Sequence, residues 1–210
     1  MFDGKSLVPI LLLVLGIITF FITLRHKITS SSYSSKKGIN DFIEREQRAS
    51  QVKRGSLPET LFIRIPKEAI PSCVDPECIR VYDKLMTFIK LPLVKLKGKS
   101  NTQLKEEYGI NHLEELITFE KNYDTFMDIL IKYGTILFEK NYIQEARKVL
   151  ELAISYECDY SRAYITLGRL YKLEQDQEAL QQLISLVQMH FKDSPYLKKV
   201  MRELESLQVN

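Results

Sequence analysis

The sequence has few cysteines and little net charge, and each shortage excludes a class of protein. Three cysteines among 210 residues cannot supply the regular framework of a disulfide-stapled miniprotein. A formal net charge of +3 gives no support to a nucleic-acid contact, which needs a basic face. We therefore expect no nucleic acid among the partners. With 210 residues, the chain is long enough to bury a core of its own.

Motifs for phosphate binding and metal ligation are incomplete. Residues 98–100, GKS, are similar to the end of a phosphate-binding loop, but Leu93 stands where that pattern requires a glycine. Cys73 and Cys78 are too far apart for a Cys-x-x-Cys pair and lack a second pair of ligands. The three histidines are isolated from one another. The sequence thus predicts no catalytic residue, metal, cofactor or small-molecule substrate.

Residues 7–24 are apolar at 14 of 18 positions and carry no charge. A helix of that length spans roughly 27 Å at ~1.5 Å per residue, close to the ~30 Å hydrocarbon core of a bilayer. The alternative is a cleaved signal peptide, which has a shorter apolar stretch and a small-x-small cleavage site; residues 25–27, RHK, supply no such site. The run predicts one uncleaved transmembrane helix after an N-terminal flank, residues 1–6.

Basic residues flank this run unevenly, and cytoplasmic flanks carry the excess of Lys and Arg. One lysine precedes it, whereas four basic residues follow within a short distance: Arg25, Lys27, Lys36 and Lys37. This predicts a single-pass protein of the cell membrane whose soluble domain faces the cytoplasm. An odd number of cysteines also suits a reducing compartment. The inverted, extracytoplasmic topology is the alternative.

Residues 25–38 are basic and rich in serine, the composition of a flexible linker. Residues 39–120 then predict a mostly helical intermediate region in which 61–65 form a short extended segment. One helix begins at Asp75, with Pro76 in its first turn. Two short helices follow, with capping-box spacing at Ser100–Gln103 and at Asn111–Glu114. Cys78 is either a small core residue or a thiol made mildly acidic by the helix N-terminus.

The last third of the chain is self-similar at a 34-residue spacing. Tyr133-Gly134 and Leu167-Gly168 recur at that distance, with large or small apolar residues at matching positions on either side. The pattern resembles the tetratricopeptide repeat (TPR), whose signature is a large residue, Leu-Gly and Tyr in a first helix and two alanines in a second. The chain is similar to membrane-anchored bacterial-type TPR proteins.

The resemblance implies repeats over residues 127–160 and 161–193, followed by a capping helix over 194–210. Ala179 lies one residue early in the second copy, which predicts a residue missing from the turn near Gln175. The expected fold is all-α: a transmembrane helix, a linker, and antiparallel helix pairs stacked as an α-solenoid. A generic antiparallel helical bundle is the alternative.

TPR proteins bind peptides or partner helices in a concave groove lined by the first helix of each pair. The alignment implies that eight residues line this groove: Asp128, Ile131, Thr135, Phe138, Arg162, Ile165, Arg169 and Lys172. Isoleucine stands at two of the positions with which some TPR proteins hold the terminal carboxylate of a partner. We therefore do not expect a carboxylate clamp in this groove. Arg162 and Arg169 lie on one helical face and either receive an acidic segment or form a solvated basic surface.

These observations predict an adaptor or scaffold, not an enzyme, that recruits a protein or peptide partner to the membrane. Two alternatives remain. An extracytoplasmic TPR accessory factor for envelope proteins shares the fold and inverts the topology. An enzyme on a helical scaffold would need convergent polar groups in a cleft.

Overall fold

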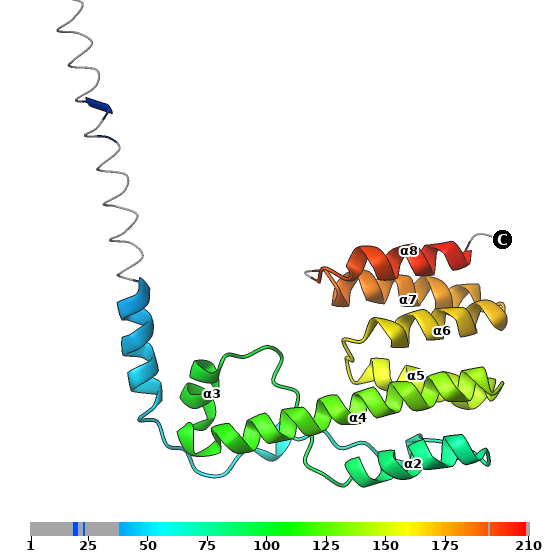
Figure 1. Ribbon diagram of the computed structural model, residues 1–210, viewed down its shortest axis with the longest axis horizontal. Helices are drawn as coiled ribbons and strands as arrows, with labels where there is room; N and C mark the ends of the chain where they lie inside the picture. Colours follow the sequence, from blue (N-terminus) through cyan, green and yellow to red (C-terminus); the bar gives the residue numbers. More distant parts are fainter. Residues whose placement is uncertain (1–18, 21–22, 24–37, 193, 209–210) are drawn as a thin grey trace, which may run out of the picture. The chain divides into compact units, whose positions relative to one another are not determined.

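The computed structural model describes residues 19–20, 23, 38–192 and 194–208 (Figure 1). Within them all regular secondary structure is helical, so the predicted all-α class is confirmed. Residues 38–49 form the first long described helix. The elements that follow are η1 (Glu59–Leu61), η2 (Lys67–Ala69), α2 (Pro76–Phe88), α3 (Asn101–Tyr108), η3 (Ile110–His112), α4 (Leu113–Glu139), α5 (Ile143–Ser155), α6 (Ser161–Leu173), α7 (Gln177–His190) and α8 (Leu197–Gln208).

The predicted transmembrane segment, residues 7–24, lies almost wholly outside the described residues, as does most of the 25–38 linker. Only Thr19, Phe20 and Thr23 of the apolar segment are described. Among the residues that the structure does describe, no helix is both long enough and apolar enough to cross a membrane.

The chain divides into two compact units, of which the first is described over residues 38–55 and 99–113. Its helix over residues 38–49 faces α3 through charged pairs. Arg45 bonds both carboxylate oxygens of Glu106 at 2.5 and 2.7 Å, and Glu46 accepts bonds from Lys105 and from the hydroxyl of Thr102. Ion pairs and hydrogen bonds therefore join the two helices.

The predicted capping box at Ser100 is confirmed, since its hydroxyl accepts the amide N–H of Gln103 at 3.3 Å. The one predicted at Asn111 is wrong. The side-chain amide of Asn111 instead exchanges two 3.1 Å hydrogen bonds with the backbone of Arg54. Gly109 ends α3 at a φ of +87°, where a Cβ atom would lie 2.6 Å from the backbone nitrogen of Arg54. The close approach of the two chain segments therefore requires glycine.

The second unit comprises residues 56–98 and 114–208, and its central element is α4. The sequence predicted a short helix near residue 111 and a separate helix from 127, but α4 runs unbroken for 27 residues. No proline or glycine occurs between its first residue and Gly134, so nothing in the covalent structure ends the helix between those predicted elements.

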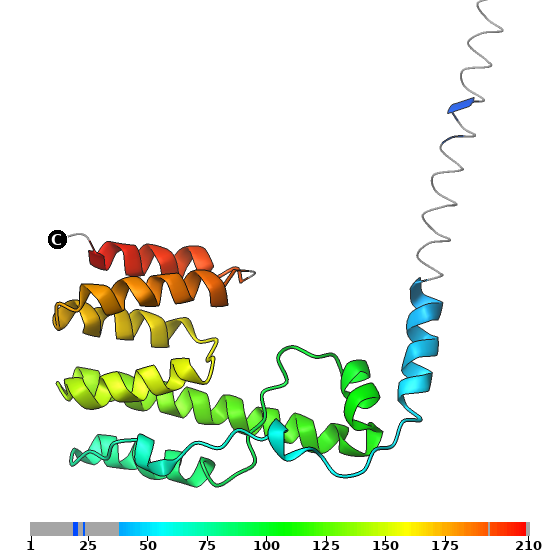
Figure 2. The ribbon, with the colours of Figure 1, turned by 180° about the vertical axis from the view of Figure 1, so that it is seen from behind.

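Helices α4 to α7 follow one another in the stack, and α8 packs against both α6 and α7 (Figures 1 and 2). The turn between α4 and α5 shares two backbone hydrogen bonds with the turn between α6 and α7. The amides of Asn141 and Tyr142 donate to Phe138 and Leu137 at 3.0 and 2.9 Å. Thirty-four residues later, the same two bonds recur at 3.1 and 2.9 Å, from Gln175 and Asp176 to Lys172 and Tyr171.

Both turns place one residue at positive φ, Asn141 at 64° and Gln175 at 59°. The two turns are therefore equal in length, and the predicted deletion near Gln175 is wrong. At the constant 34-residue spacing, Leu180 occupies the position of Ala146, and both side chains are fully buried. From the turn to this position the second copy thus differs from the first in side-chain size and not in the number of residues.

Two glycines lie where helices approach most closely. A Cβ atom on Gly134 would lie 2.9 Å from Cγ of Leu150 on α5. On Gly168 it would lie 2.4 Å from Cδ2 of Leu204, on α8, and 3.6 Å from Leu180 on α7. Gly134 thus lies at a close contact within the first helix pair, whereas the closest neighbour of Gly168 belongs to the terminal helix. Helix α8 begins at Leu197, three residues after the start of the capping helix that the sequence predicted over 194–210.

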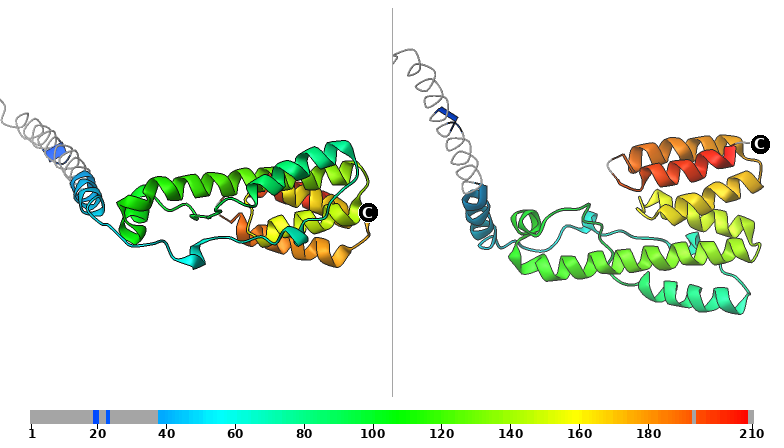
Figure 3. Two further views of the ribbon diagram at one scale, coloured as in Figure 1. Left: turned by 90° about the horizontal axis from the view of Figure 1, so that it is seen from below. Right: turned by 45° about the horizontal axis from the view of Figure 1, so that its top comes forward.

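Helix α2 begins as the sequence predicts. The carboxylate of Asp75 accepts the amide N–H groups of Glu77 and Cys78, and Pro76 occupies the first turn. Figure 3 shows α2 alongside α4, on the side away from α6 to α8. The expected extended segment at 61–65 has extended backbone from Phe62, and the amide of Ile63 donates to the carbonyl of Leu93 at 2.8 Å. Leu61 belongs to η1 instead.

Candidate functional site: the cleft between α2 and α4

Helices α2 and α4 are held together by aromatic and apolar contacts. The rings of Tyr82 and Tyr133 lie 5.8 Å apart between centroids, and the hydroxyl of Tyr133 donates to the carbonyl of Pro71 at 2.7 Å. Burial raises the pKa of Tyr133 far above its usual value, so this hydroxyl keeps its proton. Leu85 on α2 is fully buried. These contacts fix the two helices side by side.

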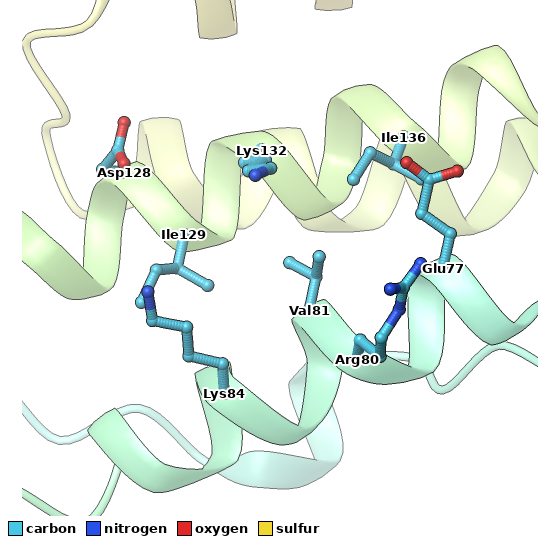
Figure 4. Close-up of a pocket in the computed structure, with 8 residues that line it drawn as sticks. All are labelled: Glu77, Arg80, Val81, Lys84, Asp128, Ile129, Lys132 and Ile136. Atoms are coloured by element: carbon cyan, nitrogen blue, oxygen red, sulfur yellow. The ribbon is translucent and has the colours of Figure 1, made fainter.

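A cleft of about 370 Å³ runs along one side of this helix pair (Figure 4). Val81 of α2 and Ile129 and Ile136 of α4 form its apolar floor. Five charged residues complete the lining: Glu77, Arg80, Lys84, Asp128 and Lys132. The two helices are antiparallel here, because Lys140, just after α4, reaches residues at the start of α2.

Within the described part of the chain the positive charges of the cleft have no partner, whereas one of the two negative charges does. Lys140 lies 3.2 Å from the carboxylate of Glu77 and 3.6 Å from that of Asp75. Among the described residues, no ion pair or side-chain hydrogen bond engages Arg80, Lys84 or Lys132. The cleft therefore presents three cations and one free carboxylate, Asp128, above an apolar floor.

The eight residues of the predicted repeat groove are distributed between surface and interior. Asp128, Arg162 and Arg169 are exposed, whereas Ile131 is buried at 3% exposure. The remaining four are partly buried: Thr135, Phe138, Ile165 and Lys172. The hydroxyl of Thr135 donates to the carbonyl of Ile131 at 2.8 Å. Of the eight, only Asp128 lies in the α2–α4 cleft.

The two arginines predicted to receive an acidic segment differ in their surroundings. Arg169 on α6 lies 3.7 Å from the carboxylate of Glu203 on α8. Arg162 has no ion-pair partner among the described residues. A partner that binds this face through both arginines must therefore compete with an internal carboxylate at one of them.

Sequence reasoning missed the three cations of the cleft. Arg80 and Lys84 are four residues apart and so share a face of α2, a signal that was available. Lys132 could not have been grouped with these two residues from the sequence, because no local pattern indicates that α2 lies beside α4. The alignment also assigned the neighbouring positions of α4 to the groove.

Other cavities of similar size lie in the second unit. One of about 330 Å³ is lined mainly by apolar residues of α5, α6 and α7, including Ile154, Leu167 and Leu186. Another, of about 370 Å³, contains Lys95, Lys97, Glu157, Asp159, Met189 and His190. Its charges are already engaged, since Lys97 lies 3.1 Å from Glu157 and Lys95 lies 3.4 Å from Asp159.

The three cysteines lie in the second unit, and all are free thiols. Cys78 and Cys158 are buried, and burial raises the pKa of each to about 12. Of the two interpretations of Cys78, the core residue is confirmed and the acidic thiol is wrong. In the part of the chain that the structure describes, no three His, Cys, Asp or Glu residues are grouped to hold a metal ion.

No family model matches this chain, and comparisons with curated proteins and with solved structures gave no match.

Proposed function

We propose that this chain is a protein-interaction scaffold of the tetratricopeptide-repeat type, held at the cytoplasmic surface of a membrane by residues 7–24. Its task is to recruit a partner protein and not to transform a substrate.

One observation carries the repeat assignment: the two turns with the same hydrogen bonds 34 residues apart. Backbone bonds and positive φ values at Asn141 and Gln175 recur together with Gly134 and Gly168. A helix pair that repeats in this way cannot bury its apolar faces alone, and stacked pairs leave long helix surfaces open to partners. The resemblance in sequence points to the same use.

The anchor rests on composition. Eighteen residues with 14 apolar side chains and no charge suit a bilayer core, and the basic residues that follow them favour a cytoplasmic domain. Alkaline carbonate extraction of membranes tests it. The full chain stays in the pellet, whereas Leu12→Arg with Leu15→Arg moves it to the supernatant. Ser32→Arg in the linker is the control, and release of the unchanged chain contradicts the anchor.

Recruitment is tested by affinity capture of the full chain from detergent-solubilised membranes after chemical cross-linking. We expect one partner or a small set of partners, enriched reproducibly over an unrelated membrane-anchored helical protein. Capture of nothing above that background contradicts the proposed function.

The predicted repeat face is tested in the same capture with Arg162→Glu and Arg169→Glu. Since Arg169 pairs with Glu203, the control exchanges that pair as Arg169→Glu with Glu203→Arg. A partner held by this face is lost from the variant that carries both Arg162→Glu and Arg169→Glu. Retention of the same partner at the same yield moves its binding surface elsewhere.

A further inference from the structure

We infer that the α2–α4 cleft is a docking site for an acidic amphipathic helix of a partner protein. The inference rests on the proposed function, and it names the surface and the chemistry of the partner.

The size and shape of the cleft suit a short helical segment. Its lining on α4 runs from Asp128 to Ile136, which is about 12 Å or two turns at 1.5 Å per residue. On α2 it runs from Glu77 to Lys84, a similar length. A partner helix lying in this cleft would place apolar side chains at i, i+3 or i+4, and i+7 against the floor.

The charge of the cleft selects an acidic partner. Arg80, Lys84 and Lys132 stand around Val81, Ile129 and Ile136 in Figure 4. Because these cations have no partner among the described residues, a carboxylate that approaches them displaces no internal ion pair. Exposed charges of this kind steer association and specify the partner more than they add affinity.

The negative residues lie at opposite ends of the cleft. Asp128 and Glu77 flank the central Lys132 in Figure 4, and Lys140 engages Glu77 at 3.2 Å. Asp128 is therefore the anion of the cleft that no described cation compensates. We expect the partner helix to carry acidic residues over the middle of the cleft and a basic or neutral residue at the Asp128 end.

An apolar floor favours a peptide over a phospholipid headgroup. The side chains of Ile129 and Ile136 are nearly buried, and with the partly buried Val81 they form an apolar strip among the cations that line the cleft. A headgroup uses the cations alone, whereas an amphipathic helix uses both the cations and the strip.

The test is a fluorescence-anisotropy titration of the full chain in nonionic detergent. The probe is a synthetic peptide of about three helical turns with Leu at the i, i+3/i+4, i+7 positions and Glu on both flanks. We expect saturable binding that weakens with salt, and at least about tenfold weaker binding to the variant Arg80→Glu, Lys84→Glu, Lys132→Glu. A peptide with Gln in place of Glu should bind the unchanged chain correspondingly weakly.

The matched control reverses three exposed lysines outside the cleft, Lys121→Glu, Lys148→Glu and Lys199→Glu, and should bind the probe like the unchanged chain. Should the cleft variant lose its helical circular dichroism, the Gln substitutions at the same three positions replace it and should weaken binding in the same direction. Equal binding by cleft and control variants, or equal binding of the Glu and Gln peptides, overturns the inference.

Two further arms separate the alternatives. If a water-soluble short-chain phosphatidylglycerol binds through the three cations and the peptide does not, the site is a lipid contact and the inference is wrong. If membrane capture yields a partner that the cleft variant still retains, the inference fails and the proposed function stands. If capture yields no partner, the proposed function itself fails.

Discussion

Gly134 and Gly168 set the distance between helices in the repeat stack. Neither lies at a turn, and each instead removes a Cβ atom from a helix–helix contact. Alanine is the better helix former by about 1 kcal/mol, so glycine at these positions lowers helix propensity in exchange for close approach. The side chains that occupy the space are leucines of the neighbouring helices and, beside Gly134, also Val149.

Gly134→Ala should lower the free energy of unfolding by about 1–2 kcal/mol. Overpacking of this kind costs about 1–3 kcal/mol, and the gain in helix propensity offsets part of that cost. Thermal denaturation followed by circular dichroism measures it. Lys121→Ala, on the exposed surface of the same helix, should leave stability within about 0.5 kcal/mol. A Gly134→Ala protein as stable as that control would mean that α4 and α5 are not in close contact.

Thiol labelling should separate the three cysteines. Cys73 is partly exposed, whereas Cys78 and Cys158 are buried with pKa values raised to about 12. A maleimide at neutral pH should label one site in the native protein and three after denaturation, as intact mass spectrometry counts. Cys73→Ser should remove the native label. Rapid labelling of Cys78 or Cys158 in the native state would contradict the burial of these thiols.

At the level of elements, Arg147 ties the first helix pair to the second. Its guanidinium lies 2.9 Å from Glu151 on its own helix, 2.8 Å from Glu174 and 3.3 Å from Asp176 in the next turn. It also lies 5.0 Å from the ring centroid of Tyr171. One planar cation thus joins α5, α6 and the turn that leads to α7.

Arg147→Ala should destabilise the protein by about 1–2 kcal/mol, because several partly buried carboxylates lose their common partner. Lys148→Ala, the exposed neighbour, is the matched control and should change stability by less than about 0.5 kcal/mol. Urea denaturation measures both. Equal midpoints for the two variants would show that the cluster contributes nothing to the stability of the stack.

Acid should weaken the first unit. The side-chain bond from Lys105 holds the pKa of Glu46 below its usual range, and the bond from Arg45 does the same for Glu106. A carboxylate whose pKa is lowered by folding stabilises the fold above the unfolded pKa of about 4.3, and that contribution is lost as pH falls through the folded value.

Amide hydrogen exchange between pH 6 and 3, corrected for intrinsic rates, should therefore show protection of residues 38–49 and of α3 falling on the acid side of about pH 4. Glu46→Gln with Glu106→Gln should remove part of this dependence. Protection that is independent of pH over that range would show that these pairs do not hold the two helices together.

The limits of sequence reasoning are visible in particular elements. Local signals succeeded where a few neighbouring residues decide the outcome, as at Asp75 and at Ser100. They failed at Asn111, whose side chain bonds a segment 57 residues away. The equal turns were obscured because Leu180 replaces an alanine, which changes volume without changing backbone length.

The candidate site was the least predictable part. Periodicity identified the faces of single helices, but Arg80 and Lys132 meet only because α2 lies beside α4. That neighbour relation depends on tertiary contacts such as the one between Tyr82 and Tyr133, and no local pattern encodes it.

For the whole molecule, a stack of helix pairs, a cationic cleft and an apolar N-terminal run fit one task. The stack supplies stable surfaces, the cleft gives one of them a charge preference, and the run would keep both near a membrane. Confinement to a surface raises the effective concentration of a partner that is also found there, so modest affinity at the cleft would suffice.

Partner recruitment through the α2–α4 cleft can be measured by site-specific photo-crosslinking of the full chain in its native membranes. A photoreactive amino acid replaces Val81 in the cleft, or Gln188 on the exposed surface of α7 as the control. We expect a discrete crosslinked partner from position 81 that disappears with the three cleft cations reversed, and none from position 188. A partner crosslinked equally from both positions, or from neither, would contradict this expectation.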